Sequence, residues 1–519
     1  MPHSSPGLAR LAMTVLQPGF DGTAPPGWLR RALGQGLGGA VLFARNLTGP
    51  AQTAELVAGL RSENPAVVVA VDEEGGTVTR LEARTGSSFP GNRALGVAGD
   101  PGRTERVARA IGRLLAGADI TLDYAPVADV NANPANPVIG VRSFGPEPGL
   151  VARHTAAWVR GLQSAGVAAC AKHFPGHGDT VTDSHLALPT VHAPLGLLRE
   201  RDLPPFRAAI EAGVRAVMCG HLLVPALDPA VPATLSRRVL TGLLREELGF
   251  EGVLVTDAIE MRAVAALHPP GEIAVRALAA GADAVCAGVS SPGGESVLAL
   301  RDAIVEAVHD GRLAEERLAE AASRVLALAA WHAARADARR AAVQEAGVRE
   351  TAPLPRAEAI VPGAGPVRDE DEELGMEAAR AALRVVVADG RAQGPVLSGA
   401  PLVVDIAPRL NMAVDPSTPT GLLGALGELL PGTAGRTVVS GTPGLPELPD
   451  DRQVVLVVHD AGRHSRAREL LAQAVRRRPD AIVVETGIPD EPIGAVYVAT
   501  HGISRASSRV VARWLTGDK

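Results

Sequence analysis

The sequence predicts an α/β protein in which a (β/α)8-type TIM barrel is followed by a smaller α/β sandwich domain. Short apolar runs alternate with longer amphipathic segments through the first part of the chain, a pattern typical of parallel βαβ units. After Gly311 the pattern changes to one long helical stretch and then to a segment rich in Pro, Gly and acidic residues. Apolar runs separated by helical segments then return. With 519 residues, the chain is also too long for one ordinary domain.

Seven apolar runs predict the strands of the barrel, and the amphipathic segments between them predict its helices. The predicted strands are residues 40–44, 67–72, 120–126, 168–173, 216–221, 252–257 and 282–287. The predicted helices include residues 51–61, 103–116, 149–165, 203–212 and 237–248. Seven such units fit a barrel better than an open sheet, although one of the eight strands of a barrel is missing from the count.

The changes in composition also predict the domain organisation. We expect a catalytic barrel domain over residues 1–345, a linker over 346–375 and a C-terminal sandwich domain over 376–519. Strands of the second domain are expected at 383–387, 402–406, 437–440, 454–458, 481–485 and 495–500, with helices at 421–430, 465–477 and 504–515. Two strand ends there carry His459-Asp460 and Glu485, for which ordinary loop positions are the simpler interpretation.

Composition and charge exclude several classes of protein. The net charge of -6, without a cluster of Lys and Arg, gives no footprint for a nucleic-acid partner. No apolar stretch is long enough for a membrane span, and the amino-terminal residues lack the pattern of a secretory signal, so we expect a cytoplasmic enzyme. The three cysteines, Cys170, Cys219 and Cys286, each fall in a strand-like run, which predicts buried thiols rather than disulfides or zinc ligands.

Titratable residues gather where the predicted barrel strands end. Residues 172–185 hold three histidines, two aspartates and a lysine, directly after a small apolar run. Other strand ends supply Asp72 with Arg80, Arg142, His221 and Asp257. A barrel enzyme assembles its site from the carboxyl ends of several strands, so we expect these groups around one opening. Acids, an Arg and a Lys suit a hydroxyl-rich ligand such as a sugar, because each hydroxyl both donates and accepts hydrogen bonds.

Two sets of residues are candidates for catalysis. Asp257 fits a catalytic acid at a strand end, but with Glu260 three residues later it fits a helix cap equally well. Asp183 lies two residues before His185 and could orient its imidazole as a general acid, whereas a packing or surface histidine is the simpler interpretation of that pair alone. The His173 and His177 spacing also allows a metal site, but Pro175 and Gly176 break the helix that a zincin motif requires.

Taken together, these strings resemble the signature of glycoside hydrolase family 3 β-N-acetylglucosaminidases, the enzymes of peptidoglycan recycling. The main string is Lys172-His173-Phe174-Pro175-Gly176-His177-Gly178-Asp179-Thr180, with Asp183-Ser184-His185 after it. Similar strings occur at residues 72–76, 137–144, 232–236 and 252–261. The resemblance covers the barrel, and the C-terminal domain resembles the second α/β sandwich of longer family members.

The resemblance implies a role for each matching residue. It implies that Asp257 is the nucleophile of a retaining mechanism and that His185, paired with Asp183, is the acid/base. The residues implied to bind N-acetylglucosamine in the minus-one subsite are Asp72, Arg80, Arg142, Lys172 and His173. The implied substrates are N-acetylglucosaminides and muropeptides. We expect no metal or organic cofactor and a monomer or weak dimer.

Some positions depart from the family pattern, and other functions stay open. Thr77 stands where many relatives carry Arg, and Ala258 stands where some carry a second Asp. The alternatives are a family 3 phosphorylase, in which phosphate replaces water, a β-glucosidase or broad β-hexosaminidase, and a sugar-binding protein without activity.

Overall fold

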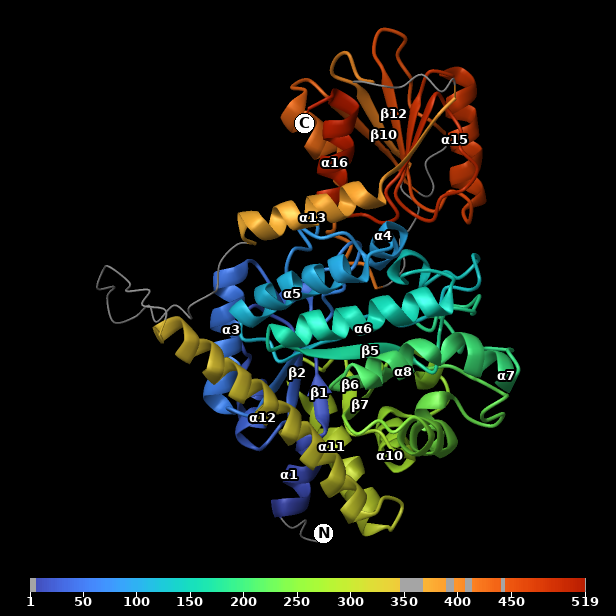
Figure 1. Ribbon diagram of the computed structural model, residues 1–519. Helices are drawn as coiled ribbons and strands as arrows, with labels where there is room; N and C mark the ends of the chain where they lie inside the picture. Colours follow the sequence, from blue (N-terminus) through green and yellow to red (C-terminus); the bar gives the residue numbers. More distant parts are fainter. Residues whose placement is uncertain (1–5, 346–366, 389–395, 407–412, 440–443, 519) are drawn as a thin grey trace.

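Eight short parallel strands close into a barrel in the first part of the chain (Figure 1). The computed structural model describes residues 6–345, 367–388, 396–406, 413–439 and 444–518. The barrel strands are β1 (Leu16–Pro18), β2 (Gly39–Leu42), β3 (Val68–Val71), β4 (Leu122–Asp123), β5 (Ala168–Phe174), β6 (Ala216–Cys219), β7 (Val253–Thr256) and β8 (Val285–Ala287). β2 to β7 form one parallel sheet, and β1 pairs with β8. Single bridges, Gly19 to Val41 and Val255 to Ala284, join the two parts into a ring, which confirms the predicted barrel.

The strand missing from the sequence count is β1. It has three residues, ends at Pro18 and contains the polar Gln17. The Tyr124 hydroxyl donates a hydrogen bond of 2.6 Å to Gln17 Oε1 inside the barrel. A run this short carries no periodic signal, and only its pairing with β8 makes it a strand.

Helices follow the barrel strands and cover them on the outside. They include α2 (Gly27–Gly34), α3 (Pro50–Glu63), α4 (Asn92–Ala98), α5 (Pro101–Gly117), α6 (Pro148–Ser164), α8 (Pro204–Glu211), η5 (Arg238–Glu247), α10 (Pro270–Ala280) and α11 (Glu295–His309). Several of them begin with Pro, whose fixed φ and missing N–H suit the first helical position. The five predicted helices all coincide with members of this layer.

Alternating side chains build two apolar layers from the same strands. On β3, Val68 and Ala70 belong to the cluster inside the barrel, whereas Val69 and Val71 pack against the surrounding helices. The long helix α12 (Glu315–Glu345) adds Val325 to the inner cluster. The interior is therefore packed with side chains, and polar groups are left to the carboxyl ends of the strands.

The second domain is a six-stranded sheet with helices on both faces, as predicted. Its strand order is β11-β10-β12-β13-β14-β9, and only β9, which pairs with β14, runs antiparallel to its neighbour. The strands are β9 (Arg384–Val387), β10 (Leu402–Ile406), β11 (Ala434–Val438), β12 (Val454–Val458), β13 (Ile482–Glu485) and β14 (Val496–Ala499). Helix α15 (Ser465–Arg477) packs on one face, and α14 (Leu422–Leu429) and α16 (Arg505–Thr516) pack on the other.

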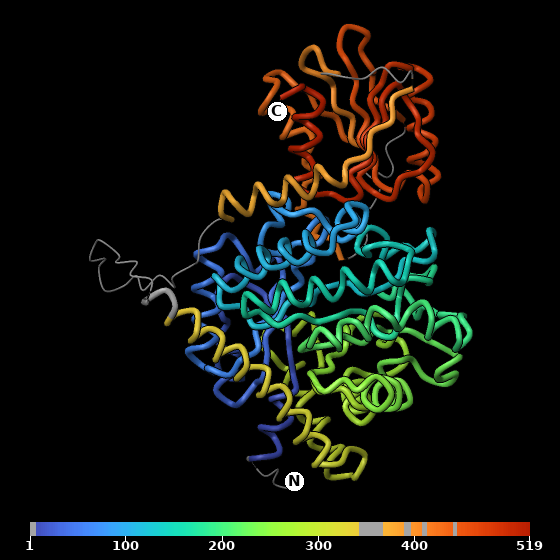
Figure 2. The backbone as a smooth tube through the Cα atoms, viewed as in Figure 1, coloured from blue at the N-terminus to red at the C-terminus, as the bar shows by residue number. Residues whose placement is uncertain are grey.

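Helix α13 (Asp369–Ala382) lies between the barrel and the second domain, and Figure 2 shows the second domain on this side of the barrel. Most of the predicted linker, 346–375, falls outside the described residues, and its last part belongs to α13, so the predicted boundaries stay a prediction. Arg505 donates a hydrogen bond to Glu82 in the barrel at 2.9 Å, and Thr77 Oγ1 accepts one from the Ile503 N–H at 3.3 Å. Thr77 therefore lies at the domain contact. Among the described residues, no helix is both long and apolar enough to cross a bilayer.

Candidate active site

A cavity of about 290 Å³ opens at the carboxyl ends of the barrel strands and collects almost all of the predicted site residues. Those that line it are Asp72, Arg80, Arg142, Lys172, His173, His185 and Asp257. Asp183 does not line the cavity but contacts His185 directly. The carboxyl ends of the barrel strands thus bring together residues that lie far apart in the sequence.

An ionic network occupies one side of the cavity. Lys172 Nζ lies 2.6 Å from Asp72 Oδ1 and 2.7 Å from Glu74 Oε1. Arg142 binds Glu74 with two hydrogen bonds, from Nε at 2.9 Å and from Nη2 at 2.7 Å. The Arg80 guanidinium lies 3.7 Å from Asp72 Oδ2. Two carboxylates and three cations therefore fix one another in this wall.

The ion pairs of this network favour the charged forms of the buried Glu74 and Lys172. Burial alone would raise the pKa of Glu74, but Arg142 and Lys172 lower it well below its usual range. Burial alone would lower the pKa of Lys172, but Asp72 and Glu74 raise it. Because charged donors and acceptors make stronger hydrogen bonds than neutral ones, the wall is suited to holding sugar hydroxyls.

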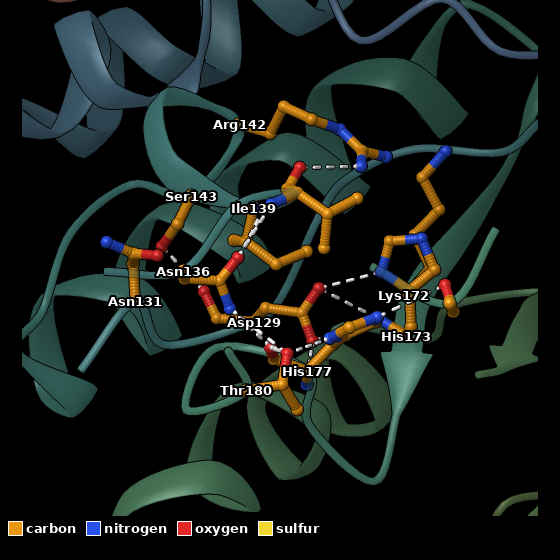
Figure 3. A network of polar contacts seen from close by, with 12 residues as sticks. Asp129, Asn131, Asn136, Ile139, Arg142, Ser143, Lys172, His173, His177 and Thr180 are labelled. Atoms are coloured by element: carbon orange, nitrogen blue, oxygen red, sulfur yellow. Dashed lines mark hydrogen bonds and ion pairs between the residues drawn. The ribbon is translucent and has the colours of Figure 1, made fainter. Parts of the chain in front are cut away.

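His173 is held by Asp129, a carboxylate with no exposed surface (Figure 3). Asp129 Oδ2 lies 2.8 Å from His173 Nδ1, and Asp129 Oδ1 accepts a hydrogen bond from the His177 N–H at 2.6 Å. Burial would raise the pKa of Asp129, but the facing His173 lowers it. The His173 ring is thereby oriented from behind by an ionised carboxylate.

Asn136 supports the loops on both sides of this wall (Figure 3). Its side chain donates to the His177 carbonyl at 2.8 Å and accepts from the Val138 and Ile139 N–H groups at 2.9 and 2.7 Å. The second domain reaches this point, because Arg463 donates a hydrogen bond to the Asn136 carbonyl. The Arg142 loop is therefore connected to both domains.

Asp183 and His185 form the predicted pair. Asp183 Oδ1 lies 2.7 Å from His185 Nδ1 and accepts the backbone N–H of His185 at 2.9 Å. Burial would raise the pKa of Asp183, but its hydrogen bonds with His185 lower it. The His185 side chain is 30% exposed, on the side of the cavity. The contact with Asp183 orients the ring, and the role of this pair stays a prediction.

Asp257 follows β7 and opens to the cavity, where it is partly exposed. The Ala258 N–H donates to Asp257 Oδ1 at 2.8 Å. Removal from bulk water would raise the pKa of Asp257, but the facing His221 and His173 lower it. The next helix, α9 (Arg262–Ala265), begins after Met261, so Asp257 does not cap it. The geometry therefore fits an ionised carboxylate available to a ligand.

The sequence prediction missed several residues of the cavity or its supports. Glu74 lies two residues after Asp72, in the 72–76 string, but only its ion pairs with Arg142 and Lys172 show that it supports the cavity wall. Asp129 also follows a predicted strand, and nothing in the sequence connects it with His173. Residues Ala413, Val414, Asp415 and Pro416 of the second domain line the cavity as well, and no sequence signal marked them.

The polar strand ends of the second domain are arranged differently. Glu485 is fully buried and accepts hydrogen bonds from the N–H groups of Asp460, Ala461 and Gly487, at 2.8, 3.1 and 2.6 Å. Burial raises the pKa of Glu485 to about 8. This carboxyl organises two loops of its own domain. Over the described residues of the whole chain, no group of three or more His, Cys, Asp or Glu side chains is placed to hold a metal ion.

A barrel whose mouth combines a ligand-accessible carboxylate, a carboxylate-held imidazole and a buried wall of fixed charges defines a carbohydrate-processing enzyme. Residues 30–328 match the family model "Glycosyl hydrolase family 3 N terminal domain". The chain therefore belongs to glycosyl hydrolase family 3.

Individual proteins of similar sequence or structure agree with this assignment. A β-hexosaminidase A of Pseudoalteromonas piscicida is 38% identical over 299 residues, which are 53% of this chain and 48% of that protein. The chain thus matches about half the length of this relative. A β-hexosaminidase of Pseudomonas aeruginosa is 40% identical over 48% of this chain and 74% of its own length. A solved family 3 β-N-acetylglucosaminidase from Paenibacillus is 34% identical, with a TM-score of 0.82 over 98% of this chain and 97% of the other.

Proposed function

We propose that the protein is a retaining β-N-acetylglucosaminidase that releases terminal N-acetylglucosamine from β-linked glycosides. The observation that carries the proposal is that Asp257 and the Asp183-held His185 belong to one cavity. A retaining glycosidase needs a nucleophile and an acid/base at one glycosidic bond. The two relatives called β-hexosaminidases and the structure called a β-N-acetylglucosaminidase support the substrate class.

In the proposed mechanism, Asp257 attacks the anomeric carbon and forms a glycosyl-enzyme. The neighbouring histidines favour the ionised carboxylate that this attack requires. His185 protonates the departing oxygen and, in the second step, takes a proton from the attacking water. With Nδ1 bound to Asp183, Nε2 is the ring nitrogen left for proton transfer. Asp183 fixes the ring and stabilises its protonated form.

The proposed minus-one subsite consists of Asp72, Arg80, Arg142, Lys172 and His173. Fixed charges can hold sugar hydroxyls in one orientation without reorganising during the reaction. Arg80 offers a further hint, because its Nε is buried and finds no hydrogen-bond partner among the described residues. Because Arg80 lines the cavity, a small rotation of its side chain would present this N–H to a substrate hydroxyl or to the N-acetyl carbonyl. No step of this mechanism uses a cofactor.

The finer parts of the proposal concern the natural substrate and setting. We include muropeptides from peptidoglycan as substrates, with a cytoplasmic location and a monomer or weak dimer. The segment Ala413 to Pro416 gives the second domain a place on the cavity wall, where it would meet the leaving-group side of a substrate.

Trapping with a 5-fluoro N-acetylglucosaminide, followed by peptide mapping, tests the proposal. We expect covalent label on Asp257 and faster reaction than with the matched 5-fluoro glucoside. Label on another residue, or no label with rapid turnover, would contradict the assigned nucleophile. Product analysis in phosphate buffer separates hydrolysis from phosphorolysis, since release of N-acetylglucosamine 1-phosphate would replace the hydrolase assignment with the phosphorylase.

A further inference from the structure

Two polar side chains behind the candidate nucleophile are not explained by the cavity. His221 follows β6, and Thr234 lies in the short helix η4 (Ala233–Leu235), within the 232–236 string of the sequence. Both have no exposed surface, and neither lines the cavity. They therefore cannot touch a substrate bound there, and any contribution to the reaction must pass through another residue.

Hydrogen-bond chemistry fixes the tautomer of His221. Its Nε2 lies 3.0 Å from the Ala258 carbonyl, which can only accept, so Nε2 carries a hydrogen. Its Nδ1 lies 2.8 Å from Thr234 Oγ1. Burial lowers the pKa of His221, which favours the neutral ring and leaves a lone pair on Nδ1. The Thr234 hydroxyl is then the donor to Nδ1.

The Thr234 hydroxyl has two competing acceptors, the Gly220 carbonyl at 3.0 Å and the weakly accepting Cys219 Sγ at 3.8 Å. That carbonyl already accepts the Leu222 N–H at 3.0 Å, so it keeps a partner when Thr234 donates to His221. The Thr234 hydroxyl therefore donates to the His221 ring, and the ring donates to the Ala258 carbonyl, in a chain of two hydrogen bonds. Each polar atom along it is satisfied, as buried groups require.

Ala258 connects this chain to Asp257. Its N–H holds Asp257 Oδ1 at 2.8 Å, while its carbonyl receives the His221 Nε2–H and also the Met261 N–H at 3.1 Å. A rotation of the Ala258 backbone would move the N–H that orients the carboxylate. Such rotation would break the bond to His221. The orientation of the Asp257 carboxylate therefore depends on the buried His221 imidazole, which lies at the end of the neighbouring strand.

We propose that Thr234 and His221 form a positioning pair that fixes the aim of the Asp257 carboxylate through Ala258. The inference rests on the proposed role of Asp257 as nucleophile and adds two residues that prepare it for attack. A displacement of about 1 Å at a reacting group can lower the rate on the order of 100-fold. A pair of residues that only positions the carboxylate can therefore have a large effect on the rate.

The first test compares Thr234→Val, which keeps the shape but removes the donor, with Thr234→Ser, which keeps the hydroxyl. We expect Thr234→Val to slow trapping of Asp257 by the 5-fluoro sugar about 10- to 100-fold, with kcat reduced more than KM is raised. Thr234→Ser should recover most of the loss. Thr241→Val is the matched control, because Thr241 makes a comparable hydrogen bond, to the Ala280 carbonyl at 2.8 Å, away from the cavity.

The second test uses the pH profile of His221→Gln, and it also covers the case in which Thr234→Val does not fold. The titratable groups that interact with Asp257 include His173, His177, His185, His221, Glu260 and the thiols of Cys170, Cys219 and Cys286. The hydrogen bond from the Ala258 N–H helps to lower the pKa of Asp257, so loosening Ala258 by removing the His221 ring should move the acid limb of kcat/KM to higher pH. Because His185 and Asp183 keep their contact, we expect the basic limb to stay in place.

The outcomes separate this inference from the proposed function. If wild-type label falls on a residue other than Asp257, the proposed function fails first. If label falls on Asp257 but folded Thr234→Val and His221→Gln keep the wild-type trapping rate and acid limb, the positioning pair is overturned. A loss of thermal stability with unchanged kcat would likewise assign the pair a structural role and reject the inference.

Discussion

The barrel and the second domain both place an acid directly after an apolar strand, and the two acids behave in opposite ways. Asp257 is partly exposed to a cavity, and facing histidines lower its pKa. Glu485 is fully buried against three backbone N–H groups, and burial raises its pKa to about 8. The two strand-end acids therefore differ in their access to a ligand and in the groups that face them, and of the two Asp257 is the one open to a cavity.

The strongest test of this contrast is activity after loss of each acid. We expect Asp257→Asn to lower kcat/KM by a factor on the order of 10⁴ or more, because an amide cannot form the glycosyl-enzyme. Glu485→Gln should leave kcat/KM near the wild-type value. Both would be measured with an aryl N-acetylglucosaminide on protein shown to be folded by circular dichroism. Loss of turnover in folded Glu485→Gln would break the comparison.

The acid/base pair gives the next largest effect. His185→Gln should lower turnover of substrates with poor leaving groups by about 10²- to 10⁴-fold, since their oxygen must be protonated as it departs. The loss should shrink for an activated aryl leaving group. Asp183→Asn should follow the same trend with a smaller loss, because the ring stays but its orientation and charge support weaken. Equal losses with both kinds of leaving group would argue against acid catalysis by His185.

The ionic wall of the barrel should also matter for stability. Glu74→Gln leaves buried Arg142 and Lys172 with one carboxylate fewer, and breaking such a network costs about 3–5 kcal/mol of unfolding free energy. In the second domain, Asp480 forms an ion pair with Arg478, and its side chain is 58% exposed. Asp480→Asn should therefore cost about 1 kcal/mol or less of unfolding free energy. Urea unfolding of both variants checks the difference. Similar losses would mean that burial does not distinguish the two sites.

The last prediction concerns the pH dependence of stability. The pKa of Glu485 is raised in the folded state to about 8, so its favourable contribution is present below its ordinary value of 4.5 and is lost as pH rises toward 8. Asp257 has a lowered pKa, so its contribution is lost instead as pH falls. Relative to wild type, Glu485→Gln should therefore gain thermal stability between pH 5 and about pH 8. A constant difference across that range would contradict the raised pKa.

Periodicity carried most of the fold prediction. Each of the seven predicted barrel strands and of the six predicted strands of the second domain overlaps an observed strand, because apolar runs between turn residues are buried as strands. The agreement is poorest at 120–126, where β4 keeps only two residues, and at 437–440, which shares two residues with β11 and ends outside the described residues. The exception is β1. Its three residues include Gln17 and Pro18, and ring closure with β8 rather than local preference makes them a strand.

The site residues also fall into two groups, those that chain order places at the cavity and those that only tertiary contacts bring there. Chain order and parallel strands were enough to expect Asp72, Lys172 and Asp257 around one opening, because the carboxyl ends of parallel strands meet at one face. The order did not reveal that Asp129 lies behind His173, or that Ala413 to Pro416 from the other domain reach the cavity. Those contacts depend on loop paths and domain packing, which local sequence does not encode.

By itself, the sequence determined the barrel, the second sheet and the strand ends that carry polar groups, because burial of apolar runs and the direction of parallel strands follow from residue order. Only the tertiary structure decided that Asp257 opens to a cavity while Glu485 is enclosed by backbone amides. The physical reason is that solvent access and neighbouring charge set the state of a carboxyl, and both arise from segments distant in the chain.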